Sequence, residues 1–114
     1  MSEANLDKIR RLARYVNRNP EDSFSKFALA LELLKNNQPE KALVLFESVY
    51  QNDPDYLGTY FHLGKLYRQL ERLRDAQRCY REGIELADRQ QDRRTESELQ
   101  EALLELELEM NDDE

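Results

Sequence analysis

The sequence repeats itself with a period of 34 residues. Small and apolar residues return at matching places in 23–56 and 57–90: Leu29, Ala30, Leu33, Ala42, Phe46, Val49 and Pro54 correspond to Leu63, Gly64, Tyr67, Ala76, Tyr80, Gly83 and Asp88. A repeat of this length is one supersecondary unit that cannot bury its apolar face alone, so it stacks on its neighbours. The repeat therefore limits the chain to architectures built by stacking similar units.

The composition favours helices in these units. Charged residues make up 36% of the chain, and it contains only three Gly and three Pro. This is too few turn residues for a sandwich or barrel built from many short strands. Since 114 residues also fit one domain by size, we expect residues 1–114 to form a single all-α domain.

Apolar residues at helical spacing predict about six antiparallel helices. Pro20 lies one period before Pro54, so the helix that it follows corresponds to the second half of a preceding repeat. The predicted parts, in chain order, are an N-terminal half-repeat helix at 5–19, a first repeat at 23–56, a second repeat at 57–90, a C-terminal capping helix at 95–110 and an acidic tail at 111–114.

Several residues predict where these helices begin and end. Ser23 is an acceptable N-cap for the helix that follows it, and Thr95, with Glu98 three residues later, forms a capping-box pattern. The Asn36–Asn37 pair tolerates the left-handed backbone of a tight turn between two helices. Asp88 stands where the first copy has a proline, so we expect the last helix of the second repeat to run longer.

The period, the residue pattern and a turn at the same place in each copy resemble the tetratricopeptide repeat family. The resemblance covers residues 23–90 and, more weakly, the flanking helices. It implies an α-α superhelix with a concave surface that holds another protein, and a role in binding rather than catalysis. Lys26, Val49 and Asp88 depart from the family pattern without changing this fold assignment.

The resemblance also implies that the first helix of each hairpin lines the concave groove. This predicts nine partner-binding residues: Phe24, Phe27, Leu31 and Lys35 in the first copy, and Phe61, His62, Lys65, Arg68 and Gln69 in the second. We expect the groove to bind a peptide or helix with apolar anchors at one end and an acidic residue near Lys65 and Arg68 at the other. The alternative is that Phe24, Phe27 and Leu31 are core residues, covered by the first helix or by the cap.

Family members that hold the acidic C-terminal tails of chaperones use a clamp of one Lys and two Asn. The matching places in this sequence contain Phe27, Leu31 and His62. A carboxylate buried against Phe27 and Leu31 would lose its solvation without gaining a donor. We therefore expect chaperone tails not to bind.

The sequence contains no pattern typical of an enzyme or a cofactor site. His62 is the only histidine, Cys79 has no evident base partner, and three glycines cannot build a phosphate loop. We expect no catalysis, no cofactor and no metal. A lone cysteine cannot close an internal disulfide, and charges interrupt the N-terminal segment, so we expect a cytoplasmic protein without a signal peptide or membrane span.

Two alternatives to a protein-binding adaptor remain open. One is a self-assembling dimer, because Leu103, Leu104, Leu106 and Leu108 are more leucine than one helical stripe needs. The other is RNA binding through arginine stripes, namely Arg10, Arg11, Arg14 and Arg18 near the N-terminus and Arg74, Arg78 and Arg81 in the second repeat. Nucleic acid is disfavoured because no aromatic platform accompanies the arginines and residues 95–114 carry nine acidic and no basic side chains.

Overall fold

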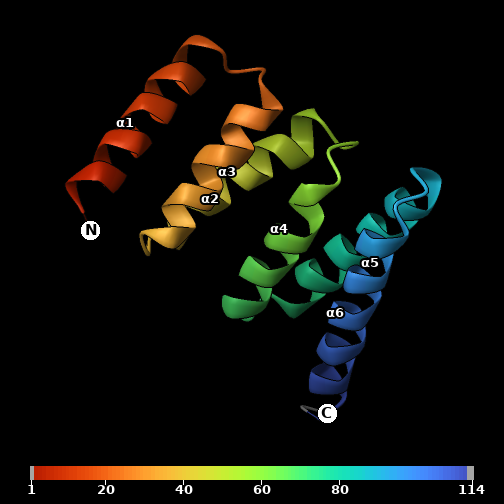
Figure 1. The fold of residues 1–114 in the computed structure, drawn as a ribbon. Helices are drawn as coiled ribbons and strands as arrows, with labels where there is room; N and C mark the ends of the chain where they lie inside the picture. The colour runs from red at the N-terminus through yellow and green to blue at the C-terminus, as the bar shows by residue number, and fades with distance from the viewer. Residues whose placement is uncertain (1, 113–114) are drawn as a thin grey trace. The chain divides into compact units, whose positions relative to one another are not determined.

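The computed structural model describes residues 2–112, which form six α-helices and no β-strand (Figure 1). The helices are α1 (Glu3–Arg18), α2 (Ser23–Lys35), α3 (Pro39–Asn52), α4 (Gly58–Gln69), α5 (Leu73–Arg89) and α6 (Arg93–Asp112). The prediction of an all-α helical repeat of about six helices is therefore confirmed. None of the helices in this described part is long and apolar enough to cross a membrane.

The helices group into two compact units, which are described separately. The first unit comprises α1–α3 and the second comprises α4–α6, with the division between Tyr56 and Leu57. Within each unit, helices that follow one another in the chain pack together: α1 on α2, α2 on α3, α4 on α5, and α5 on α6. The assignment of the whole chain to one domain stays a prediction.

The core of the first unit lies between α2 and α3. Its buried apolar residues are Leu29, Ala30 and Leu33 from α2 and Ala42, Phe46 and Val49 from α3. Helix α1 buries no residue completely; Leu6, Ile9 and Val16 on its apolar face are half-buried. Packing of the α2–α3 hairpin thus accounts for most of the buried apolar surface in this unit, and α1 covers it only in part.

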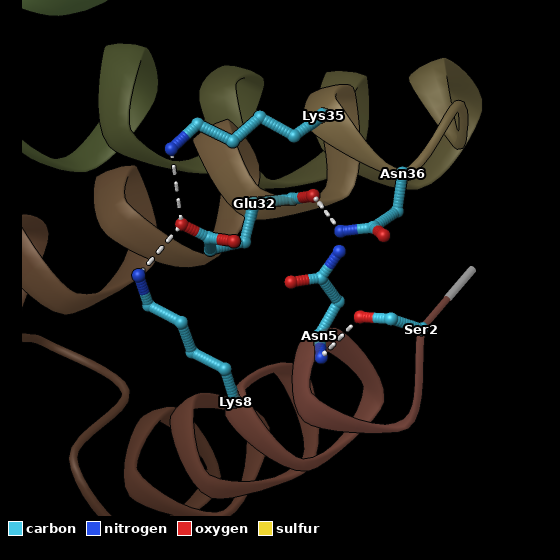
Figure 2. Close-up of polar contacts among 6 residues, drawn as sticks. All are labelled: Ser2, Asn5, Lys8, Glu32, Lys35 and Asn36. Carbon is cyan, nitrogen blue, oxygen red and sulfur yellow. Dashed lines mark hydrogen bonds and ion pairs between the residues drawn. The ribbon is translucent and has the colours of Figure 1, made fainter.

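A polar cluster joins α1 to α2 at one end of this unit (Figure 2). The buried carboxylate of Glu32 lies 2.9 Å from Nζ of Lys8 in α1 and 3.5 Å from Nζ of Lys35 in its own helix. The hydrogen bond from Lys8 and the charges of both lysines hold the pKa of Glu32 below its usual value. The carboxylate is therefore ionised and paired, as a buried charge must be.

Three helices end in the same turn. In each, a residue with left-handed backbone follows the helix, and the next N–H donates to the carbonyl oxygen five residues back, which is a Schellman motif. The left-handed residues are Asn37, Glu71 and Gln91, with φ of 60°, 60° and 59°, and the closing bonds are Gln38 to Leu33, Arg72 to Tyr67 and Asp92 to Ala87, at 2.9, 2.8 and 2.9 Å. The turn predicted at Asn37 is present, and α6 follows α5 through the same device.

Two N-cap predictions were wrong. The Oδ1 atom of Asp22 accepts from the Ser25 N–H at 3.2 Å, so α2 is capped by Asp22 and not by Ser23. Likewise Oδ1 of Asp92 accepts from the Thr95 N–H at 3.1 Å, and α6 begins at Arg93. In both places an aspartate upstream, one residue before Ser23 and three residues before Thr95, supplies a carboxylate acceptor whose negative charge also suits the N-terminus of a helix.

Close approach between helices shapes the second unit. A Cβ atom at Gly64 of α4 would lie 2.8 Å from Cδ1 of Tyr80, and one at Gly83 of α5 would lie 2.7 Å from Cβ of Tyr60 and 2.9 Å from Cδ1 of Leu99. Both glycines are buried. Their missing side chains let α5 pack directly against α4 and α6.

Helix α5 is three residues longer at its C-terminal end than α3, counted in repeat register. Helix α3 ends at Asn52, two residues before Pro54, whereas α5 continues through Asp88 to Arg89. Proline in a helix interior lacks the N–H that the helical ladder needs, and aspartate supplies it. The longer helix predicted from Asp88 is therefore present.

Candidate functional site

The predicted groove residues of the first unit lie on α2 and differ in accessibility. The ring of Phe27 packs against Phe46 and Tyr56, with centroid separations of 5.7 and 5.2 Å. Leu31 is half-buried, whereas 71% of Phe24 is exposed. Phe27 is thus partly a core residue of the unit, and Phe24 is a large apolar side chain open to solvent.

Lys35, the basic residue predicted in this part of the groove, is exposed, but its ammonium group already forms an ion pair. Its ammonium group shares the Glu32 carboxylate with Lys8, as Figure 2 shows. An acidic partner would compete with that carboxylate for Lys35. Charge from the α2 face is therefore weaker than the sequence alone indicates.

The predicted residues of the second unit lie on α4. Phe61 and His62 pack edge to face with centroids 5.6 Å apart, and both are half-buried. Burial, and then the nearby charge of Lys65, lower the pKa of His62. Because its ordinary value of 6.5 is already below neutrality, the imidazole is neutral at pH 7 and adds no positive charge to this face.

A surface hollow of about 320 Å³ opens between α4 and α6 above Tyr80. Its lining residues are Phe61, Lys65 and Arg68 from α4, Tyr80 from α5, and Glu98, Glu101, Ala102 and Glu105 from α6. A neighbouring hollow of about 610 Å³ is lined by Lys65, Arg68 and Gln69 together with Glu105, Leu108 and Glu109. The structure thus brings Phe61, Lys65, Arg68 and Gln69 together, and it adds an acidic wall from α6.

This acidic wall changes the role predicted for Arg68. Nε of Arg68 lies 2.8 Å from Oε2 of Glu109, and Nη1 lies 3.9 Å from Oε2 of Glu105. Lys65 has no ion-pair partner among the described residues. The cation of this face that is open to a partner's carboxylate is therefore Lys65, while Arg68 connects α4 to α6.

An acidic wall on α6 was not predicted from the sequence. A signal was present, since Glu98, Glu101 and Glu105 recur at helical spacing and must share one side of the helix. The spacing alone did not show that this side of the helix faces α4. No group of three or more His, Cys, Asp or Glu within residues 2–112 could hold a metal ion.

The arginine stripe predicted in the second repeat lies on α5. Arg78 of α5 pairs with Asp75 at 2.8 Å and with Glu82 at 3.7 Å, and Arg81 pairs with Glu107 at 2.7 Å. Ion pairs thus occupy much of the α5 stripe. Cys79, between these arginines in sequence, is fully buried and is not part of a disulfide.

The two hairpins contain the same type of turn, and both pack through small residues at matching positions. These features define an α-helical repeat protein. A sequence model of the tetratricopeptide repeat matches residues 33–104. The chain therefore belongs to the tetratricopeptide repeat family, as the sequence pattern indicated. Members of this family generally mediate protein–protein interactions and are generally noncatalytic.

Solved structures agree with this assignment. The chain is 50% identical to a tetratricopeptide repeat domain protein from Salinibacter ruber in its solution structure, covering 77% of this chain and 89% of that one, with a TM-score of 0.72. A crystal structure of a tetratricopeptide repeat domain protein from Salinibacter ruber gives 49% identity, 75% and 97% coverage and a TM-score of 0.73. A MamA RS-1 ArsTM double mutant, at 22% identity, 94% and 70% coverage and a TM-score of 0.60, shows the fold alone. Comparison with curated proteins gave no match.

Proposed function

We propose that the chain is a noncatalytic adaptor that binds a peptide or helix of a partner protein, and that in its second unit the contact surface is the exposed face of α4 beside the hollow above Tyr80. The observation that carries this proposal is the hollow above the buried ring of Tyr80, where the half-buried ring of Phe61 is bordered by charges of both signs. Apolar anchors in a concave setting with a few polar groups are what a binding site for an extended or helical segment requires.

The chemistry of the hollow suggests how such a segment would be read. Phe61 offers half-buried aromatic surface to an apolar anchor, whereas Tyr80 beneath it is buried. Lys65, which has no ion pair among the described residues, offers an ammonium group to an acidic residue. On the opposite wall Glu101, which has no ion pair within the described part of the chain, can accept from a basic residue. We expect a partner segment that alternates an apolar anchor with charges, rather than a uniformly acidic tail.

In the first unit, taken by itself, the exposed face of α2 offers apolar contact. Phe24 is exposed, and Phe27 and Leu31 beside it on α2 present half-buried surface. The chaperone-clamp positions Phe27, Leu31 and His62 hold no cation at pH 7, because two are apolar and the imidazole is neutral. A partner with paired terminal carboxylates is therefore disfavoured.

The supporting case for an adaptor without catalysis and in the cytoplasm is chemical. Cys79 is enclosed in the core, so a substrate would not reach its thiol. A buried thiol that is not part of a disulfide suits a reducing compartment. We propose a cytoplasmic location on this ground.

Selection of binders from a displayed random-peptide library tests the proposal, because it needs no knowledge of the natural partner. Selected peptides should lose at least tenfold in affinity for Lys65→Glu and for Phe61→Ser, measured by isothermal titration. The matched control is Arg74→Glu, which reverses an exposed charge on α5 outside both hollows. A library that yields no binder, or peptides that bind all three variants as tightly as the wild type, would contradict the proposed function.

A further inference from the structure

Helix α6 carries an apolar stripe on the side opposite its packed face. Leu99 and Leu106 are fully buried against the rest of the unit, whereas Leu104 and Leu108, one turn apart, are 59% and 57% exposed. A helix that merely solvates the end of a repeat stack would carry polar residues there. Two exposed leucines at i and i+4 form a ridge suited to contact with another helix.

The charges beside this ridge are negative. Glu101 has no ion pair among the described residues, and Glu105 lies no closer than 3.9 Å to Nη1 of Arg68. Over its full length, Arg93–Asp112, α6 contains seven acidic and two basic residues. A second copy of α6 placed on this ridge would bring carboxylates together, which is unfavourable.

Helix α1 presents the opposite charge on its outer face. It contains five basic and two acidic residues, and Arg10, Arg11, Arg14 and Arg18 are all exposed. Arg10 lies 3.6 Å from Asp7, whereas Arg11, Arg14 and Arg18 have no ion pair within residues 2–112. Tyr15, 49% exposed, adds aromatic surface beside them. Arginine stems pack well on leucine while their guanidinium groups reach carboxylates.

We propose that the chain associates head to tail, with the arginine face of α1 in one copy docking on the Leu104–Leu108 ridge and flanking glutamates of α6 in the next. Pairs of α1 faces or pairs of α6 faces would repel, so the heterologous contact is the one of these pairings that combines charge complementarity with burial of the exposed leucines. Glu101, Glu105 and Leu108 of α6 also line the two hollows, so this contact overlaps the face proposed for the adaptor. The test below measures the mass of the protein alone and does not involve a peptide partner.

The test uses two variants, each with one face removed. Arg11→Glu with Arg14→Glu reverses α1 and leaves α6 intact; Leu104→Ser with Leu108→Ser removes the ridge and leaves α1 intact. Arg74→Glu with Arg89→Glu is the control for reversing two exposed arginines elsewhere, and circular dichroism checks helicity.

Sedimentation equilibrium at about 1 mM protein suits an interface of this small size. Runs at about 10 mM and about 1 M salt, where the Debye lengths are about 30 and 3 Å, separate charge from packing.

At low salt the wild type and the arginine control should exceed the monomer mass of 13.6 kDa, and high salt should lower that excess. Each face variant alone should be monomeric. An equimolar mixture of the two should reach about twice the monomer mass, because one intact α1 then meets one intact α6 and the assembly stops at a dimer. A monomeric wild type, self-association of either face variant alone, or a monomeric mixture would overturn the proposal. So would an unchanged mass in the α1 variant together with loss of RNA binding, which would assign the arginine face to nucleic acid.

Discussion

The clearest quantitative test of the packing in the second unit is Gly83→Ala. The added Cβ would lie 2.7 Å from Cβ of Tyr60 and 2.9 Å from Cδ1 of Leu99. Cβ of Tyr60 moves only with the backbone of α4, and Leu99 is fully buried, so relief requires α5 to shift away from a neighbouring helix. We take the upper part of the overpacking range, about 3 kcal/mol.

Alanine also favours the helix over glycine by about 1 kcal/mol, which offsets part of this cost. The net destabilisation is then about 2 kcal/mol. An unfolding entropy of about 0.24 kcal/mol/K for a chain of this length converts it to a fall in Tm of about 8 °C.

Thermal melting and urea titration followed by circular dichroism measure this effect. Ser97→Ala, at an exposed site of α6, is the control for helix propensity, and its stability should change by less than about 0.5 kcal/mol. A Gly83→Ala variant that melts at or above the wild-type temperature, with the control behaving as expected, would refute the close packing described for α4, α5 and α6.

Three further predictions concern single positions. Ala76→Leu should destabilise by about 1–3 kcal/mol in urea titration, because Ala76 is fully buried and a larger side chain overpacks its contact. Hydrogen bonding from the Thr95 N–H lowers the pKa of Asp92 in the folded state. Asp92 should therefore contribute its full stability above its ordinary pKa of 3.8 and lose that contribution as the pH falls through the lower folded-state pKa. In melts recorded over a pH series, Asp92→Asn should reduce the fall in Tm at acid pH. The His62 ring, followed by NMR, should titrate below 6.5, and Lys65→Met should raise its pKa only in part, because burial is the larger cause.

Periodicity predicted the repeat architecture because core packing leaves a direct trace in the sequence. Ala42 and Ala76 stand one period apart and are both fully buried, and Asn37 has the left-handed backbone expected of its turn. These features depend on local geometry and on contact between neighbouring helices. A single sequence contains that information in its spacing of small and apolar residues.

Helix ends and cross-helix contacts were predicted less well, for two physical reasons. Asp22 and Asp92 competed with Ser23 and Thr95 for the N-cap positions, and adjacent polar residues give no periodic signal to choose between them. Arg68 and Glu109 are 41 residues apart, so their 2.8 Å contact depends on how α6 is rotated against α4 and α5. The same rotation exposes Leu104 and buries Leu106, which composition alone could not separate.

Binding of a partner segment to the α4–α6 hollow of the second unit is tested most directly by mapping with NMR. Amide chemical shifts of the labelled protein would be recorded while a library-selected peptide is added to saturation. We expect the largest shifts at Phe61, Lys65 and Ala102 around the hollow. Shifts confined to α1, to α3 or to the side of α5 away from Tyr80 would contradict it.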